Sequence, residues 1–147
     1  MEKPNYTISF LVSRNTDETY ASINSVRGWW SGEIVGETDK LGSEFIYTVT
    51  GVHRSTQKII QLEPGKKIVW LVTDAELNFV QDKAEWKGTE IIFEIQKSDV
   101  GSEVKFTHKG LNTTQECYSD CSNAWGMLIG KNLKNFIITG KAQPSPW

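Results

Sequence analysis

The sequence predicts an α+β fold in which a run of antiparallel strands closes around one C-terminal helix. Seven segments of the 147 residues alternate apolar and polar side chains, which is the period of a half-buried strand. A short helical pattern follows the first segment, and one long helical pattern follows the last. Because a sheet that wraps a single helix tends to leave an apolar space beside it, we predict a domain with a cavity.

The strands are predicted from alternation and from the turn residues between them. Tyr6 to Val12 form the first, and the others cover residues 32–37, 45–49, 53–62, 67–73, 91–95 and 104–108. The connection 75–87 is longer than the usual hairpin loop of about 2–5 residues. It is interpreted either as a rim or lid of the cavity or as a short extra helix.

The short helix is predicted between two local signals. Asn15 begins an Asn-x-x-Glu start pattern that reaches Glu18, and Gly28 ends the helix. Trp29 and Trp30 follow in a turn, where one can fill the domain and the other can border the cavity.

The long C-terminal helix is predicted from a capping box at its start and a glycine at its end. Thr113 and Glu116 form the capping box, and the helix runs to about Thr139, with Gly140 as its stop. At about 100° per residue, Asn132 falls near the centre of the apolar face. A buried amide needs hydrogen-bond partners, which are a sheet residue, a buried water or a ligand group. A distortion of the helix would instead rotate this amide outward.

Composition and charge exclude several classes of protein. The chain has 16 basic and 18 acidic residues, interspersed, so it has no basic stripe for nucleic acid. No apolar stretch reaches the roughly 20 residues of a membrane span, and no signal peptide is evident, which predicts a cytoplasmic protein. The two histidines lack metal-ligand spacing, and Cys117 and Cys121 are interpreted as buried reduced thiols. We therefore expect no metal and no cofactor.

Several short motifs together resemble one known family. They are Gly28-Trp29-Trp30-Ser31-Gly32, Gly42-x-x-Phe45, Glu63-Pro64-Gly65-Lys66-Lys67-Ile68-Val69-Trp70, Phe106-Thr107-His108-Lys109-Gly110-Leu111 and Cys121-Ser122-Asn123-Ala124-Trp125-Gly126. With them the chain resembles the SRPBCC superfamily, also called START-like or Bet v 1-like, over roughly residues 6–140. Within it the chain is most similar to single-domain homologues of the activator of heat-shock protein 90 ATPase.

The resemblance implies a helix-grip fold, with a curved seven-stranded antiparallel sheet around the C-terminal helix and a cavity between them. We expect a single domain over residues 1–147, with a core of about 6–140 and a flexible tail of 141–147. The superfamily includes lipid carriers, polyketide cyclases, hormone receptors and co-chaperones, so the fold alone does not fix the activity.

The function predicted here is the binding of a small, largely apolar molecule in that cavity, with a homodimer left open. Alternation and the helix pattern predict as ligand-binding residues Trp30, Phe45, Tyr47, Trp70, Phe93, His108, Trp125, Leu128 and Asn132. His108 is also the one weak candidate for catalysis, as the acid/base of a polyketide cyclase or aromatase-like enzyme. Its other interpretation is a structural bond to the backbone near the helix start. A third possibility for the chain is a protein-interaction module of the co-chaperone type.

Overall fold

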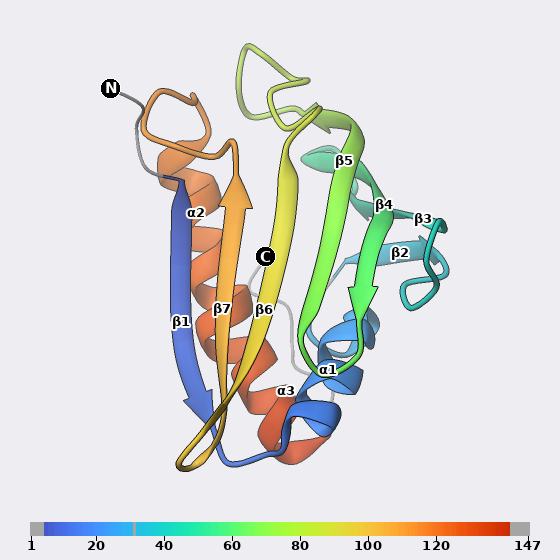
Figure 1. Cartoon of the computed structure of the whole chain (residues 1–147). Coiled ribbons are helices and arrows are strands. Elements are labelled where there is room, and N and C mark those ends of the chain that lie inside the picture. The colour runs from blue at the N-terminus through green and yellow to red at the C-terminus, as the bar shows by residue number, and fades with distance from the viewer. Residues whose placement is uncertain (1–4, 31, 142–147) are drawn as a thin grey trace.

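The computed structural model describes residues 5–30 and 32–141, and its strands form one antiparallel sheet (Figure 1). The strand order is β1-β7-β6-β5-β4-β3-β2, so β1 and β2 lie at the two edges. The strands are β1 (Tyr6–Val12), β2 (Glu33–Gly36), β3 (Glu44–Val49), β4 (His53–Glu63), β5 (Lys67–Leu77), β6 (Glu90–Ser98) and β7 (Gly101–Lys109). The predicted seven-stranded antiparallel sheet is confirmed.

One long C-terminal helical segment lies along the concave face of the sheet (Figure 1). It consists of α2 (Tyr118–Met127), the π-helical turn η2 (Leu128–Leu133) and α3 (Lys134–Thr139). The short helix α1 (Thr16–Asn24) and the 3₁₀ turn η1 (Val26–Gly28) follow β1 and contact the far end of this segment. This arrangement confirms the helix-grip fold.

The strands bury alternate residues, as β7 illustrates. Its inward side chains are Ser102, Val104, Phe106 and His108, and each is fully buried, whereas their neighbours are exposed or half-buried. Period-2 alternation therefore identified the inward face of this strand correctly.

The short helix begins and ends where its local signals are. Asn15 caps α1, because its side-chain oxygen accepts a hydrogen bond of 2.8 Å from the backbone N–H of Glu18. The chain then turns through η1, and the side chains of Trp29 and Trp30, which follow it, lie in the core and are almost completely buried.

The start of the C-terminal helix differs from the prediction. The helix begins at Tyr118, and the Thr113-to-Glu116 capping box does not form. The backbone N–H groups of Glu116 and Cys117 donate instead to the carboxylate of Glu85, at 2.8 and 3.0 Å. A carboxylate about thirty residues earlier in the chain has thus replaced the local cap.

The π-helical turn η2 changes which residues of the last helix face the sheet. A π turn inserts one extra residue, so a regular 100° pattern does not continue through it. Beyond η2, Ile137 is buried while Phe136 is only half-buried. The ring of Phe136 lies against Gly28, at a place where a Cβ atom would overlap the ring.

The helical segment lies close to the edge strand β1 at Gly130. A Cβ atom there would be 3.2 Å from Cδ1 of Ile8, which is tighter than an ordinary contact, whereas a Cβ atom at Gly126 would lie at an ordinary 3.7 Å from the hydroxyl of Tyr6. The absence of a side chain at Gly130 therefore helps the helix approach this side of the sheet.

A helix that crosses a bilayer needs about 20 consecutive apolar residues. Within residues 5–30 and 32–141, no helix is long and apolar enough for that.

Candidate functional site

A pocket of about 340 Å³ opens beside α2, under the connection from β5 to β6 that we call loop 78–88. Its volume falls within the range of about 300–1,000 Å³ that ligand sites occupy. Phe79 and Met127 are partly exposed at its mouth. The lining residues are Trp30, Tyr47, Val52, His53, Phe79, Trp86, Asp120, Cys121, Asn123, Ala124, Trp125, Met127 and Leu128.

Five of the lining side chains are aromatic rings that contact one another in a closed circuit. Trp30 stacks on Tyr47, with ring centroids 4.1 Å apart, and Tyr47 meets His53 edge-on at 5.2 Å. His53 meets Trp86 edge-on at 4.8 Å, Trp86 stacks on Trp125 at 5.7 Å, and Trp125 returns to Trp30 at 5.3 Å. These separations suit favourable aromatic pairs. This five-ring circuit joins β3, β4, loop 78–88, α2 and the segment after η1, so its rings hold one another in place.

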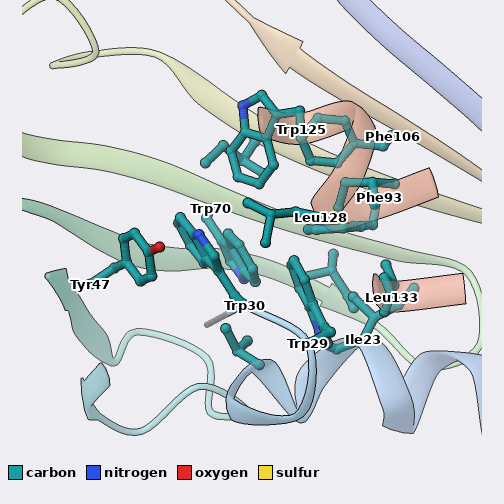
Figure 2. Packing of buried hydrophobic residues seen from close by; sticks show 14 of the residues in the cluster. Ile23, Trp29, Trp30, Tyr47, Trp70, Phe93, Phe106, Trp125, Leu128 and Leu133 are labelled. Carbon is teal, nitrogen blue, oxygen red and sulfur yellow. The ribbon is translucent and has the colours of Figure 1, made fainter. Parts of the chain in front are cut away.

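A second layer of aromatic side chains fills the space behind the circuit. Trp30 lies between Tyr47 and Trp70 (Figure 2), and its indole is parallel to that of Trp70 within 2° at 6.0 Å. Phe45 and Phe93 meet Trp70 edge-on, at 5.0 and 5.1 Å. This part of the fold is therefore a packed core, and the pocket occupies only the end of the sheet near loop 78–88.

His53 places a polar group in the otherwise apolar wall. Its Nε2 lies 2.8 Å from the hydroxyl of Ser55, which also accepts a hydrogen bond of 2.6 Å from Nε2 of Gln57. The three residues alternate along β4, so all three point inward. Burial lowers the pKa of His53 to about 4, so the ring is neutral at pH 7.

His108 is completely buried, and both of its ring nitrogens have partners. The indole N–H of Trp125 donates to Nδ1 at 3.1 Å, so the proton of the neutral ring is on Nε2. Nε2 donates to the Thr89 hydroxyl at 2.8 Å, and that hydroxyl donates to the backbone carbonyl of Trp86 at 2.6 Å. Burial, and secondarily the nearby His53, lower the pKa of His108 to about 3. The imidazole thus holds Trp125 and loop 78–88 in place.

Two carboxylates fasten loop 78–88 to the start of α2. The Glu85 carboxylate accepts from the backbone N–H groups of Glu116 and Cys117 at 2.8 and 3.0 Å. In return, the Glu116 carboxylate accepts from the backbone N–H groups of Gln81 and Asp82 at 3.2 and 2.9 Å. We call this reciprocal pair the carboxylate clamp. It keeps the loop, with two residues of the pocket lining, against the helix.

A protein-family model confirms the resemblance found in the sequence. The model described as Activator of Hsp90 ATPase homolog 1-like protein matches residues 18–137, which is most of the chain. The chain belongs to the Activator of Hsp90 ATPase homolog 1-like family. No curated protein gives a significant match.

Several solved structures share the fold of this family member. The solution structure of the Aha1 dimer from Colwellia psychrerythraea is 23% identical, with 96% of this chain and 99% of that chain covered and a TM-score of 0.72. Protein MLL2253 from Mesorhizobium loti is 12% identical, with coverages of 91% and 96% and a TM-score of 0.73. DynU16, a putative protein in the dynemicin biosynthetic locus, is 11% identical, with coverages of 92% and 48% and a TM-score of 0.67. At these identities the likeness shows the fold alone.

The predicted ligand-binding residues of this Activator of Hsp90 ATPase homolog 1-like protein divide into two groups. The pocket lining includes Trp30, Tyr47, Trp125 and Leu128, and it does not include Phe45, Trp70, Phe93, His108 and Asn132. The four strand residues of the second group lie elsewhere because alternation identifies the inward face of a strand but not which end of that face borders a cavity. Asn132 is buried within η2, so helix distortion has not turned it outward.

Sequence reasoning missed several residues of the lining. Phe79 and Trp86 lie in the long connection 75–87, whose length was the available signal for a rim or lid. The alternative of an extra helix there is wrong, because loop 78–88 consists of turns. His53 also had a signal, since it is the first of three polar residues at alternate inward positions of β4.

The two cysteines are free and buried near the pocket. The indole N–H of Trp86 donates to Sγ of Cys117 at 3.3 Å. The hydrogen bond with Cys117, followed by burial, raises the pKa of the Cys121 thiol, which keeps it protonated and weakly nucleophilic. Among residues 5–30 and 32–141, no group of three or more His, Cys, Asp or Glu side chains is arranged to hold a metal ion.

Proposed function

We propose that this protein binds a small, largely apolar molecule in the pocket bordered by the five-ring circuit. The circuit is the observation that carries the proposal, because it presents a preformed aromatic wall to a pocket of about 340 Å³. Pockets of this kind gain affinity from apolar burial and use few polar groups for orientation. As the sequence predicts, we place this activity in the cytoplasm.

His53 is the polar group that we expect to orient the ligand. Its Nε2 is bonded to Ser55, and within the described part of the chain no hydrogen-bond partner meets its Nδ1. A ligand that combines an apolar body with one hydrogen-bonding group therefore suits the pocket.

The two alternative functions have less support. An acid/base role for His108 would need a free ring nitrogen facing the pocket, whereas both of its nitrogens have protein partners. DynU16 belongs to a biosynthetic locus, but it shares 11% of its residues with this chain. A co-chaperone role is supported by the description of the family alone.

We also propose that the protein forms a homodimer. The support is the dimeric state of the Colwellia protein, together with the exposed edge strand β2. Val35 of β2 and Ile46 of β3 are cross-strand partners, and they are 57% and 37% exposed. An exposed edge strand can pair with another chain, and an exposed apolar patch can mark an interface.

Ligand binding is tested with N-phenyl-1-naphthylamine, a neutral apolar probe that fluoresces when bound. Ala124 lines the pocket from α2, so Ala124→Phe should fill part of the volume and weaken probe binding at least tenfold. Ala21→Phe is the matched control, because Ala21 is exposed on α1. An absence of probe binding to the wild-type protein, or equal binding to both variants, would refute the proposal.

A further inference from the structure

Among the residues that the structure describes, Asp120 is the one charged member of the pocket lining. It lies in the first turn of α2, and its side chain is exposed at the mouth. Within the described residues, its carboxylate has neither an ion pair nor a hydrogen bond to another side chain. The two lysines of loop 78–88, Lys83 and Lys87, are exposed and do not belong to the lining.

The turn that leads into α2 already holds a carboxylate. Free N–H groups near the start of a helix attract negative ligands, and the N–H groups of Glu116 and Cys117, just before α2, already bond to the Glu85 carboxylate. The Glu116 carboxylate belongs to the same turn and bonds to loop 78–88 rather than to the pocket. Within the described residues, the negative charge of the pocket lining therefore comes from Asp120.

The wall below Asp120 suits a positive charge for a different reason. Trp and Tyr rings attract cations through the negative potential of their faces, and clusters of such rings bind quaternary ammonium groups. Three tryptophans and a tyrosine belong to the five-ring circuit and to the pocket lining, although stacking on one another and on Trp70 covers most of their faces. His53, the remaining ring, is neutral at pH 7 because burial lowers its pKa to about 4, so it does not repel a cation.

We propose that the ligand of this pocket is an organic cation, a small ammonium compound with apolar or aromatic substituents. Its apolar body lies against the five-ring circuit, and its charge lies between those rings and the Asp120 carboxylate. This inference rests on the proposed function and adds the charge of the ligand to it.

The test compares two molecules that have the same shape and differ in charge. Trimethylphenylammonium is a cation, and tert-butylbenzene is its neutral isostere. Each is titrated against the complex of the protein with N-phenyl-1-naphthylamine at pH 7, and loss of probe fluorescence gives its affinity. The same titrations are made with Asp120→Asn and with Asp99→Asn. Asp99 is an exposed control in the β6–β7 turn, at the opposite end of the sheet from loop 78–88 (Figure 1).

We expect the cation to bind about tenfold more tightly than its isostere. Asp120→Asn should weaken the binding of the cation about two- to fivefold, reduce the salt dependence of that binding, and leave the affinity for tert-butylbenzene unchanged. Asp99→Asn should change none of these three quantities. Equal or tighter binding of the neutral isostere would overturn the inference and leave the proposed function standing. A cation preference that survives Asp120→Asn would remove Asp120 from the site. Failure of the probe itself to bind would refute the proposed function, and the inference with it.

Discussion

His53 is a buried member of the five-ring circuit and His108 is buried beside it, and neither is free to take up a proton in the folded state near pH 7. Burial lowers the pKa of His53 to about 4 and that of His108 to about 3, whereas an unfolded histidine titrates near 6.5. Because the folded pKa is below the unfolded pKa, the unfolded chain binds protons first as the pH falls. The stability that comes from keeping these rings neutral is complete above about pH 6.5 and is lost as the pH falls toward the folded values.

This linkage predicts a loss of stability in mild acid. Between pH 7 and pH 5, each histidine should lower the free energy of unfolding by about 2 kcal/mol. Urea unfolding followed by tryptophan fluorescence at pH 7, 6 and 5 measures the effect. His53→Gln keeps a hydrogen-bonding group beside Ser55. In this variant, the fall in the free energy of unfolding between pH 7 and pH 5 should be about half as large. A free energy of unfolding that is the same at pH 7 and pH 5 would show that the rings are not held neutral.

Among the helices and loops, the start of α2 shows where local sequence patterns stop being sufficient. Thr113 and Glu116 have the spacing of a capping box, but Glu116 bonds to loop 78–88 and Glu85 caps the helix. Both contacts join residues more than thirty positions apart, so no short window of sequence contains them. The cap of α1 at Asn15 is local, and there the prediction was correct.

The carboxylate clamp should control how often loop 78–88 opens. In the double variant Glu85→Ala/Glu116→Ala, four backbone N–H groups lose their acceptors, so amide hydrogen exchange across residues 78–88 should become at least tenfold faster. Loss of the helix cap should cost about 1–2 kcal/mol of stability. Hydrogen exchange read by mass spectrometry is the measurement.

The control for the clamp is Glu103→Ala, which removes an exposed carboxylate from β7 that makes no ion pair within the described residues. In this control variant, amide hydrogen exchange across residues 78–88 should be as slow as in the wild-type protein. Unchanged exchange of loop 78–88 in the double variant would mean that other contacts, such as the burial of Trp86, hold the loop without the clamp.

For the whole molecule, the sequence predicted the sheet and the two helices because each depends on periodicity that the chain displays, and the resemblance to a known family implied the helix-grip arrangement. Inward residues such as Phe45, Trp70 and Phe93 were also identified correctly as buried. Their position relative to the pocket could not be predicted, since it depends on Trp29 and Trp30 filling that part of the interior from outside the sheet. Packing across long sequence separations decides which part of an apolar face is left open.

The proposed homodimer makes a prediction at this same scale. If β2 and its neighbour form the interface, sedimentation equilibrium should give twice the 16.6 kDa mass of one chain. Val35→Lys places a charge at the edge and should give the single mass, because burying an unpaired lysine in an interface is unfavourable. Val100→Lys, at an equally exposed valine in the β6–β7 turn, should remain dimeric. A monomeric wild-type protein would refute the dimer, and a dimeric Val35→Lys would place the interface elsewhere.

The central claim is that a small molecule binds in the pocket bordered by the five-ring circuit, and the indole N–H signals of the protein test it most directly. Three tryptophans of the circuit, Trp30, Trp86 and Trp125, line the pocket, whereas Trp29 is not part of the lining and its indole donates to the Ile23 carbonyl at 3.1 Å. In a ¹H–¹⁵N titration with N-phenyl-1-naphthylamine, the signals of the three lining indoles should shift together with one dissociation constant, and that of Trp29 should shift much less. Shifts that spare the three lining indoles would contradict the account.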